Sequence, residues 1–193
     1  WILRPLDEVA ERHRDVQPRQ WVSGESQFYL GRRYVLKTIN DPKQRKITCK
    51  LKGSQLQVVG RELNSERTQS AIRLWYRERA QDVFHRRLNL VVEMLPWTDK
   101  VPMWRLVEMQ TQWGSCSPEG MVLLNPHLIK APTRAIDYVL LHELCHLEEH
   151  NHSQRFYSLL DRFMPEWQSV KEQLDGKAEL YLANHKSWIQ PFS

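Results

Sequence analysis

The sequence predicts a single α+β domain spanning residues 1–193. Between residues 27 and 59, apolar side chains alternate with polar ones around glycines, as in short strands joined by turns. From residue 65 onward, apolar side chains recur every three or four positions, as on the buried face of a helix. A second strand region and further helical patterns follow after residue 103. Strands and helices thus occupy separate stretches of the chain, which favours the α+β class.

The first strands are expected to form a small β-meander within residues 27–59. Gly31 separates two strands and Gly53 separates two more. On either side of Gly53, Leu51 and Leu56 continue the alternation of apolar and polar residues. A period of two places alternate side chains on one face of a sheet, so these strands should cover a core on one side.

A long amphipathic helix is expected over residues 65–95, with Ser65 or a neighbour as its N-cap. Its apolar positions follow the helical period and are Ile72, Trp75, Ala80, Val83, Phe84, Leu88, Val91 and Leu95. Six arginines crowd the same segment.

Residues 103–129 are expected to form a β-hairpin packed on the helix that follows. One strand should run through about 105–113, the segment Ser-Pro-Glu-Gly should make the turn, and residues 121–125 should return. Pro132 suits an early position in a helix, which should continue to about residue 148.

Two further helices are expected near the C-terminal end. Asn151 is a candidate N-cap, with Gln154 three residues later, for a helix ending near Phe163. Pro165 should start the next helix, and Gly176 lies near its end.

Charge is distributed unevenly along the chain, whose net charge is +5. Residues 1–100 carry 20 Lys and Arg against 12 Asp and Glu, a balance of +8, whereas residues 101–193 carry 8 against 11, a balance of −3. A basic half can indicate a nucleic acid or nucleotide partner, although a solvated basic surface is the common alternative.

The cysteine content and the apolar segments indicate a cytoplasmic protein without a membrane span. Three widely spaced cysteines do not form a disulfide framework, which favours a reducing compartment. No apolar run approaches the roughly 18 residues that cross a bilayer. The first residues also lack the basic and then apolar pattern of a signal segment.

The segment His142-Glu143-Leu144-Cys145-His146 contains the residues expected to bind a metal and to catalyse a reaction. Residues four apart on a helix lie on one face, so His142 and His146 can bind one Zn²⁺ ion. Glu143 can then take the proton of a water molecule that the metal activates. The alternative is a helix whose histidines are merely exposed to solvent, but the surrounding leucines leave little room for a solvent-exposed face.

The third ligand must come from another segment. His152 is preferred because a turn after residue 150 would swing its imidazole back over the first two. His150 is the second candidate, since it lies one helical turn past His146. A glutamate, Glu148 or Glu149, is the weaker option.

Three segments resemble the YgjP-like metallopeptidase family, relatives of the SprT-like zincins. They are "MQTQWGSCSPEGMVLLN", "APTRAIDYVLLHELCHL" and "NHSQRFYSLLDRFMPEW", and the resemblance is dense from about Glu108 to Leu174. It implies a zincin-like fold, Zn²⁺ held by His142, His146 and His152, and Glu143 as the base. Gln112 stands where the family usually has Arg, and Glu149 stands where the related metzincin spacing has glycine.

Residues near the motif have more than one reading. Trp113, Gly114 and Ser115 are expected on a strand beside the helix, where they can line a peptide substrate or simply pack. Cys145 is expected to be a core thiol, and Cys116 as a fourth, closing ligand is a minority reading. Asp137, Asn125 and Asp161 are candidate partners of the ligand imidazoles, and Tyr157 is a candidate oxyanion donor.

Three functions remain open at this point. The first is a zinc-dependent hydrolase acting on a peptide or protein. The second is a metal-dependent nucleotide pyrophosphatase, a role attached to some members of the family. The third is a nucleic-acid-associated module with a structural zinc, which the basic N-terminal half motivates.

Overall fold

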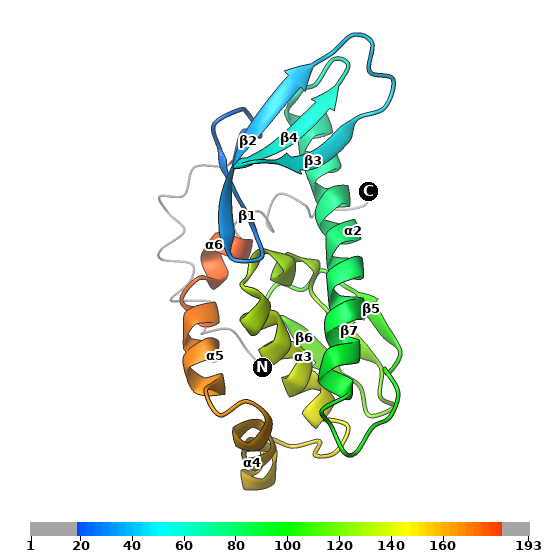
Figure 1. Ribbon diagram of the computed structural model, residues 1–193, viewed down its shortest axis with the longest axis vertical. Helices are drawn as coiled ribbons and strands as arrows, with labels where there is room; N and C mark the ends of the chain where they lie inside the picture. The colour runs from blue at the N-terminus through cyan, green and yellow to red at the C-terminus, as the bar shows by residue number, and fades with distance from the viewer. Residues whose placement is uncertain (1–18, 183–193) are drawn as a thin grey trace, which may run out of the picture.

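The computed structural model describes residues 19–182 (Figure 1). The prediction about a signal segment falls on residues 1–18 and therefore lies outside the described residues. The elements run in the order β1 (Ser26–Tyr29), β2 (Arg32–Asn40), β3 (Thr48–Lys52), β4 (Gln55–Gly60), α2 (Ser65–Val92), β5 (Trp104–Leu106), β6 (Gly114–Cys116), β7 (Val122–Leu124), the 3₁₀ helix η2 (Pro126–Lys130), α3 (Thr133–Cys145), α4 (Gln154–Phe163), α5 (Trp167–Asp175) and α6 (Ala178–Leu182).

The N-terminal strands form one sheet, but its order is β1-β2-β4-β3. Both hairpins are antiparallel as expected, whereas β2 and β4 pair in parallel, with Leu36 opposite Leu56. The predicted β-meander is therefore wrong in its strand order. Leu36, Leu56 and Val58 are fully buried, and the two strands that carry them take the centre of the sheet. The alternation of apolar and polar residues along a strand specifies which face is buried, but it does not specify which strand pairs with it.

Helix α2 confirms the predicted long helix and connects the two halves of the molecule. Its first turns lie beneath the four-stranded sheet, and its later turns run beside α3 (Figure 1). Asn64 caps it, because its side-chain oxygen accepts a hydrogen bond from the Arg67 N–H at 2.8 Å. The cap is thus the residue directly before Ser65, one of the neighbours that the prediction included.

The second sheet has three strands in the order β5-β7-β6. The turn after Cys116 and the β6–β7 hairpin agree with the prediction, but the expected first strand is split. Its start, β5, pairs in parallel with the far side of β7. The segment between β5 and β6 is held as a loop by Asn125, whose amide donates to the carbonyls of Met109 and Gln112 at 2.8 and 3.0 Å. Strand β6 therefore lies at an edge of the sheet.

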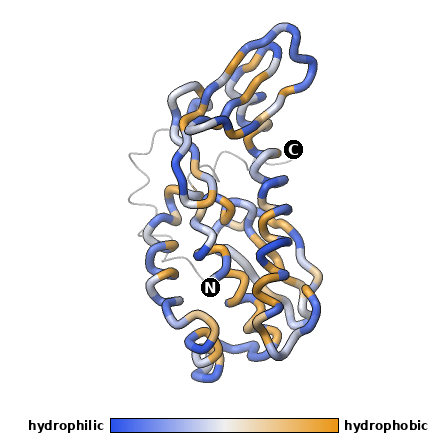
Figure 2. The backbone as a smooth tube through the Cα atoms, in the orientation of Figure 1, coloured by the Kyte–Doolittle hydropathy of each residue, from blue (hydrophilic) through white to orange (hydrophobic). Residues whose placement is uncertain are grey.

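Helix α3 is apolar and buried along its length, and it ends at Cys145 rather than near residue 148. Up to residue 182, three helices follow instead of the expected two, because α6 adds a short third one. Helix α4 is capped by Ser153, whose hydroxyl accepts from the Phe156 N–H at 3.3 Å, so Asn151 is not the cap. In Figure 2 the apolar stretches of the tube gather where α2, α3 and the second sheet meet.

The α+β class expected from the sequence is confirmed, with small sheets at both ends of α2 and helices packed on α3. None of the helices within residues 19–182 combines the length and apolar composition that a membrane crossing requires.

A bidentate ion pair joins α2 to α3. The Arg87 guanidinium donates to both carboxylate oxygens of Asp137 at 2.6 and 2.7 Å. The Asp137 side chain is only 8% exposed and that of Arg87 is 30% exposed. Paired geometry of this kind offsets the cost of bringing the carboxylate out of water.

Replacing Arg87 should therefore destabilise the fold. We expect Arg87→Met to lower the free energy of unfolding by about 2–3 kcal/mol, because it leaves the Asp137 carboxylate buried without its cation. Urea unfolding measures this change. The matched control is Arg79→Met on the same helix, whose pair with Asp82 is exposed and should contribute less than about 1 kcal/mol. Equal losses in the two variants would contradict the assigned role of the buried pair.

Candidate metal centre

Three imidazoles converge at the end of α3. His142 lies in the last turn of that helix, His146 directly follows it, and His152 lies just before α4. One ring nitrogen from each lies within 4.8 Å of the others. The Nε2 atoms of His142 and His152 are 3.1 Å apart. This spacing fits one metal ion, since imidazole ligands bind zinc at about 2.0–2.1 Å.

The chain reverses direction between the second and third imidazoles. The N–H groups of Leu147 and Glu149 donate back to Leu144 and Cys145 at 3.2 and 2.9 Å, which closes α3. The Glu149 carbonyl then lies 3.2 Å from His146 Nδ1. A hydrogen bond there orients the ring and leaves Nε2 as its ligand atom.

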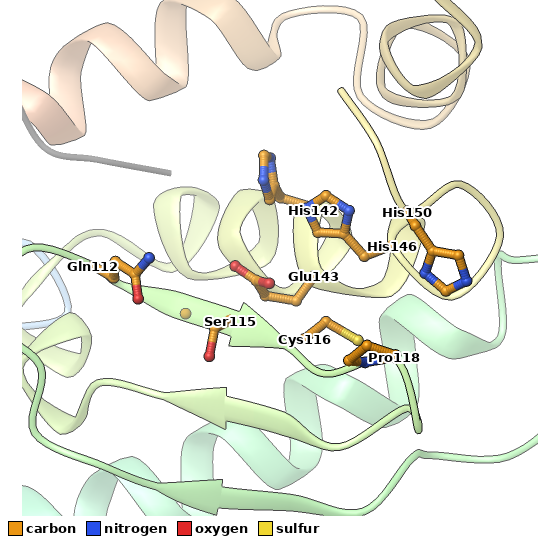
Figure 3. Close-up of a pocket in the computed structure, with 9 residues that line it drawn as sticks. Gln112, Ser115, Cys116, Pro118, His142, Glu143, His146 and His150 are labelled. Atoms are coloured by element: carbon orange, nitrogen blue, oxygen red, sulfur yellow. The ribbon is translucent and has the colours of Figure 1, made fainter. Parts of the chain in front are cut away.

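His150 lies in this reversal and is exposed, outside the group of three. It borders the neighbouring cavity instead (Figure 3). The turn that the sequence predicted near residue 150 is thus present. The placement of His152 beside His142 and His146 agrees with the preferred ligand set.

Phe156 supports all three imidazoles and was missed in the sequence analysis. Its ring is fully buried, and its centroid lies 4.7–4.9 Å from the centroids of His142, His146 and His152. The available signal was the apolar face of the amphipathic helix that follows His152, on which Phe156 lies.

Burial determines the protonation state of the innermost ligand. His142 is 3% exposed. Desolvation, reinforced by the nearby His146 and His152, lowers the pKa of His142 well below its usual value. The neutral imidazole that results is the form that binds a metal.

Glu143 points from α3 toward the edge strand β6, with Ser115 on the facing strand (Figure 3). Its side chain is almost fully buried, and desolvation raises the pKa of its carboxyl group to about 8. A cavity of about 260 Å³ opens beside it and is bordered by Gln112, Gly114, Ser115, Cys116, His142 and His146.

Gly114 permits this arrangement because it has no side chain. A Cβ atom at Gly114 would lie 2.7 Å from Glu143 Oε1 and 2.8 Å from its Cγ. Real Cβ atoms do not approach other atoms so closely. Strand β6 and the Glu143 side chain can therefore pack together only with glycine at this position.

The other predicted residues are divided between cavity and core. Ser115 borders the cavity, whereas the Trp113 side chain is fully buried and stacks edge-on to Tyr181. Cys145 is a buried core thiol, as expected. Cys116 borders the cavity but lies outside the group of three imidazoles. Burial and the neighbouring Glu143 raise the pKa of Cys116 to about 11, which keeps it a thiol.

The three predicted partners of the imidazoles have other contacts. Asp137 binds Arg87, the Asn125 amide binds the loop before β6, and Asp161 accepts a hydrogen bond from Trp167 Nε1 at 2.8 Å. Tyr157 stacks on His152, with ring centroids 6.3 Å apart, and is 39% exposed.

An α+β fold that gathers three imidazoles beside a helical glutamate is typical of metal-dependent hydrolases. The chain belongs to the YgjP-like family, whose metallopeptidase-domain model matches residues 1–177. It is accordingly a metallopeptidase-type hydrolase by family.

Solved structures similar to this chain include two metallopeptidase zymogens. Abylysin from Pyrococcus abyssi is 18% identical, with a TM-score of 0.41, and the match covers 51% of this chain and 93% of that one. Jannalysin from Methanocaldococcus jannaschii is 17% identical, with a TM-score of 0.41, covering 51% and 96%. A comparison with curated proteins finds no match.

The contact between Gly114 and Glu143 can be tested by a double-mutant cycle. We expect Gly114→Ala to lower the free energy of unfolding by about 1–3 kcal/mol, because the new methyl group overpacks the carboxylate. In a Glu143→Ala background the same change should cost less than about 1 kcal/mol, since the clashing atoms are gone. Thermal or urea unfolding of the four proteins gives the coupling. Identical costs in both backgrounds would show that the two residues do not meet.

The third ligand can be tested with single substitutions. We expect His152→Ala to weaken zinc binding by more than about 100-fold, since even the residues that orient ligands change affinity about 10- to 100-fold. His150→Ala should stay within about threefold of the wild type, because His150 lies outside the group. Competition with a chromophoric chelator measures both affinities. Strong loss in His150→Ala with little loss in His152→Ala would overturn the assignment.

Proposed function

We propose that this protein is a zinc-dependent metallopeptidase that uses the His-Glu-x-x-His segment of α3. In this proposal His142, His146 and His152 hold Zn²⁺, and Glu143 is the catalytic base. The single observation that carries it is the convergence of three imidazoles, within 4.8 Å of one another, next to a buried glutamate.

Zinc is the metal that the donor set favours. Three imidazoles are typical ligands of catalytic zinc, and no further histidine, cysteine or carboxylate joins the group within the described residues. A Zn²⁺ ion held by these residues would supply a Lewis acid that makes water a nucleophile at neutral pH. The third function considered above, a nucleic-acid-associated module, requires a structural zinc, and this has less support because Cys116, the candidate fourth ligand, lies outside the group.

Glu143 is placed to move protons at the reacting atoms. Its carboxyl group faces the cavity from the helix that carries His142. There its ionised form, which a bound Zn²⁺ cation would favour against the effect of burial, can accept a proton from attacking water and later deliver it to the leaving amine of the peptide. Gly114 holds it in this position by close packing, so the base has little freedom to turn away.

The position of strand β6 favours a peptide as the substrate. It lies at the edge of its sheet and borders the cavity through Gly114 and Ser115. An extended peptide can add to such an edge by backbone hydrogen bonds. We propose that Gly114 and Ser115 contact this peptide. The buried Trp113, whose carbonyl accepts from the Asn125 N–H at 2.8 Å, would contribute by fixing the strand from inside.

A nucleotide or nucleic acid partner stays a prediction. The outer face of the N-terminal sheet carries the exposed Lys37, Lys50 and Lys52, with Gln57 between the first two. These lysines could bind an anionic partner. They do not favour pyrophosphatase activity at the site formed by the three imidazoles. Cytoplasmic location likewise stays a prediction from the cysteine content.

Substitution of the base tests the proposal. Zinc-loaded wild-type protein should cleave peptides from a proteome-derived library, and a chelator should stop the cleavage. Glu143→Gln should lower kcat about 10²- to 10⁴-fold while zinc content and stability are retained, because an amide cannot accept the proton.

The matched control is Glu172→Gln on α5, an exposed position that should leave the cleavage rate unchanged. Turnover of Glu143→Gln within a few fold of the wild type would show that Glu143 is not the base. A wild-type protein that binds zinc and cleaves none of the library peptides would remove the peptidase assignment itself.

A further inference from the structure

A second cavity adjoins the three imidazoles and has no part in the chemistry described above. Its volume is about 290 Å³, and it lies among α3, α4 and α5. It shares His142 with the first cavity and also includes His152. A molecule bound next to His142 can therefore reach both cavities.

Aromatic rings enclose this second cavity in a closed circuit. The ring centroid of His142 lies 5.1 Å from that of His152, which lies 6.3 Å from that of Tyr157. The Trp167 centroid lies 5.6 Å from that of Tyr157 and 6.2 Å from that of Tyr138. The Tyr138 centroid lies 6.1 Å from that of His142, which completes the circuit. Three of these rings are nearly parallel: the interplanar angle is 13° between Tyr138 and Trp167, and 18° between Trp167 and Tyr157. These three rings stack in succession, so this part of the cavity lining is aromatic and suits an aromatic occupant.

The cavity is closed at one end and open at the other. Tyr138, Leu160 and Trp167 are 1%, 0% and 8% exposed, so they form an apolar floor. Tyr157 is 39% exposed, and His152 is exposed beside it. The exposed part of its border therefore includes the His152 imidazole, beside which the reacting bond of a substrate would lie.

Size and charge restrict what the cavity can take. Cavities that hold a whole drug-sized ligand usually measure about 300–1,000 Å³, so 290 Å³ suits one large side chain better than a complete nucleotide. The charged residues on its border, Lys171 and Asp175, form an ion pair with each other. Their charges largely cancel, which favours a neutral occupant.

We propose that this cavity is a specificity subsite, which takes the aromatic side chain of a peptide residue directly next to the bond to be cleaved. The proposal rests on the proposed metallopeptidase function and specifies its substrate class. The peptide backbone follows β6 along the first cavity, crosses the imidazoles beside Glu143, and places its aromatic ring on Tyr157 and Trp167.

Two hydroxamates provide a test that does not require turnover. The probes are N-acetyl-phenylalanine hydroxamate and N-acetyl-alanine hydroxamate, which share a zinc-binding group and differ by one phenyl ring. Isothermal titration calorimetry on zinc-loaded wild-type protein should show the phenylalanine compound binding at least about tenfold more tightly, because its ring is buried in the cavity.

Substitutions at Tyr157 connect this preference to the cavity. Tyr157→Ala should lower the affinity ratio of the two probes about threefold to tenfold, since it removes one aromatic wall. Tyr157→Phe should keep the ratio, because the ring is retained. Leu180→Ala on α6 is the control: Leu180 is 40% exposed, like Tyr157, lies outside the cavity, and should leave the ratio unchanged. Any loss of zinc affinity affects both probes equally and cancels in the ratio.

The outcomes separate this proposal from the one on which it rests. Equal affinity of the two probes for the wild type, or an unchanged ratio in Tyr157→Ala, would overturn the subsite and leave the metal centre intact. Failure of both probes to bind the zinc-loaded protein would overturn both proposals. Binding of a nucleoside monophosphate that is tighter than that of the phenylalanine compound, and lost in Tyr157→Ala, would reassign the cavity to a nucleobase.

Discussion

The end of α3 at Cys145 is the constraint on which the metal centre depends. In a helix continued beyond this point, residue 152 would project to a different side from His142 and residue 150 would move up the axis. Because the chain closes the helix and reverses, His152 returns to within 3.1 Å of His142. The same reversal brings the Glu149 carbonyl to His146 Nδ1, so one local turn both supplies the third imidazole and orients the second.

The start of α4 fixes the other side of that turn. Ser153, next to His152, caps the helix, and Phe156 one turn later fills the space beneath all three rings. Ligand, cap and aromatic support therefore lie within five consecutive residues. A geometry encoded over so short a segment tolerates little change in the length of the turn, because each inserted residue would rotate His152 away from its partners.

Glu143 and Gly114 connect the metal side of the site to the substrate side. The base lies on the helix and the substrate edge lies on a strand that is distant in sequence, yet they touch without intervening side chains. The aromatic circuit extends the arrangement beyond His142 through α4 and α5. Strand edge, imidazoles and aromatic cavity thus form one continuous path, while α2 and the Arg87–Asp137 pair brace α3 from behind.

The sequence by itself determined what depends on local spacing. Neighbouring residues set the four-residue interval between His142 and His146, the helical period of the apolar residues in α2, and the turn before α4. Each of these features is present in the structure. Tertiary structure decided the rest. Strand order in the first sheet and the split of the predicted hairpin depend on which buried surfaces meet, and Asn125 fixes the loop through carbonyls 13 and 16 residues away. The burial of Trp113 and the aromatic cavity likewise arise from contacts between separate elements, because alternation and spacing identify a buried face and leave its partner undefined.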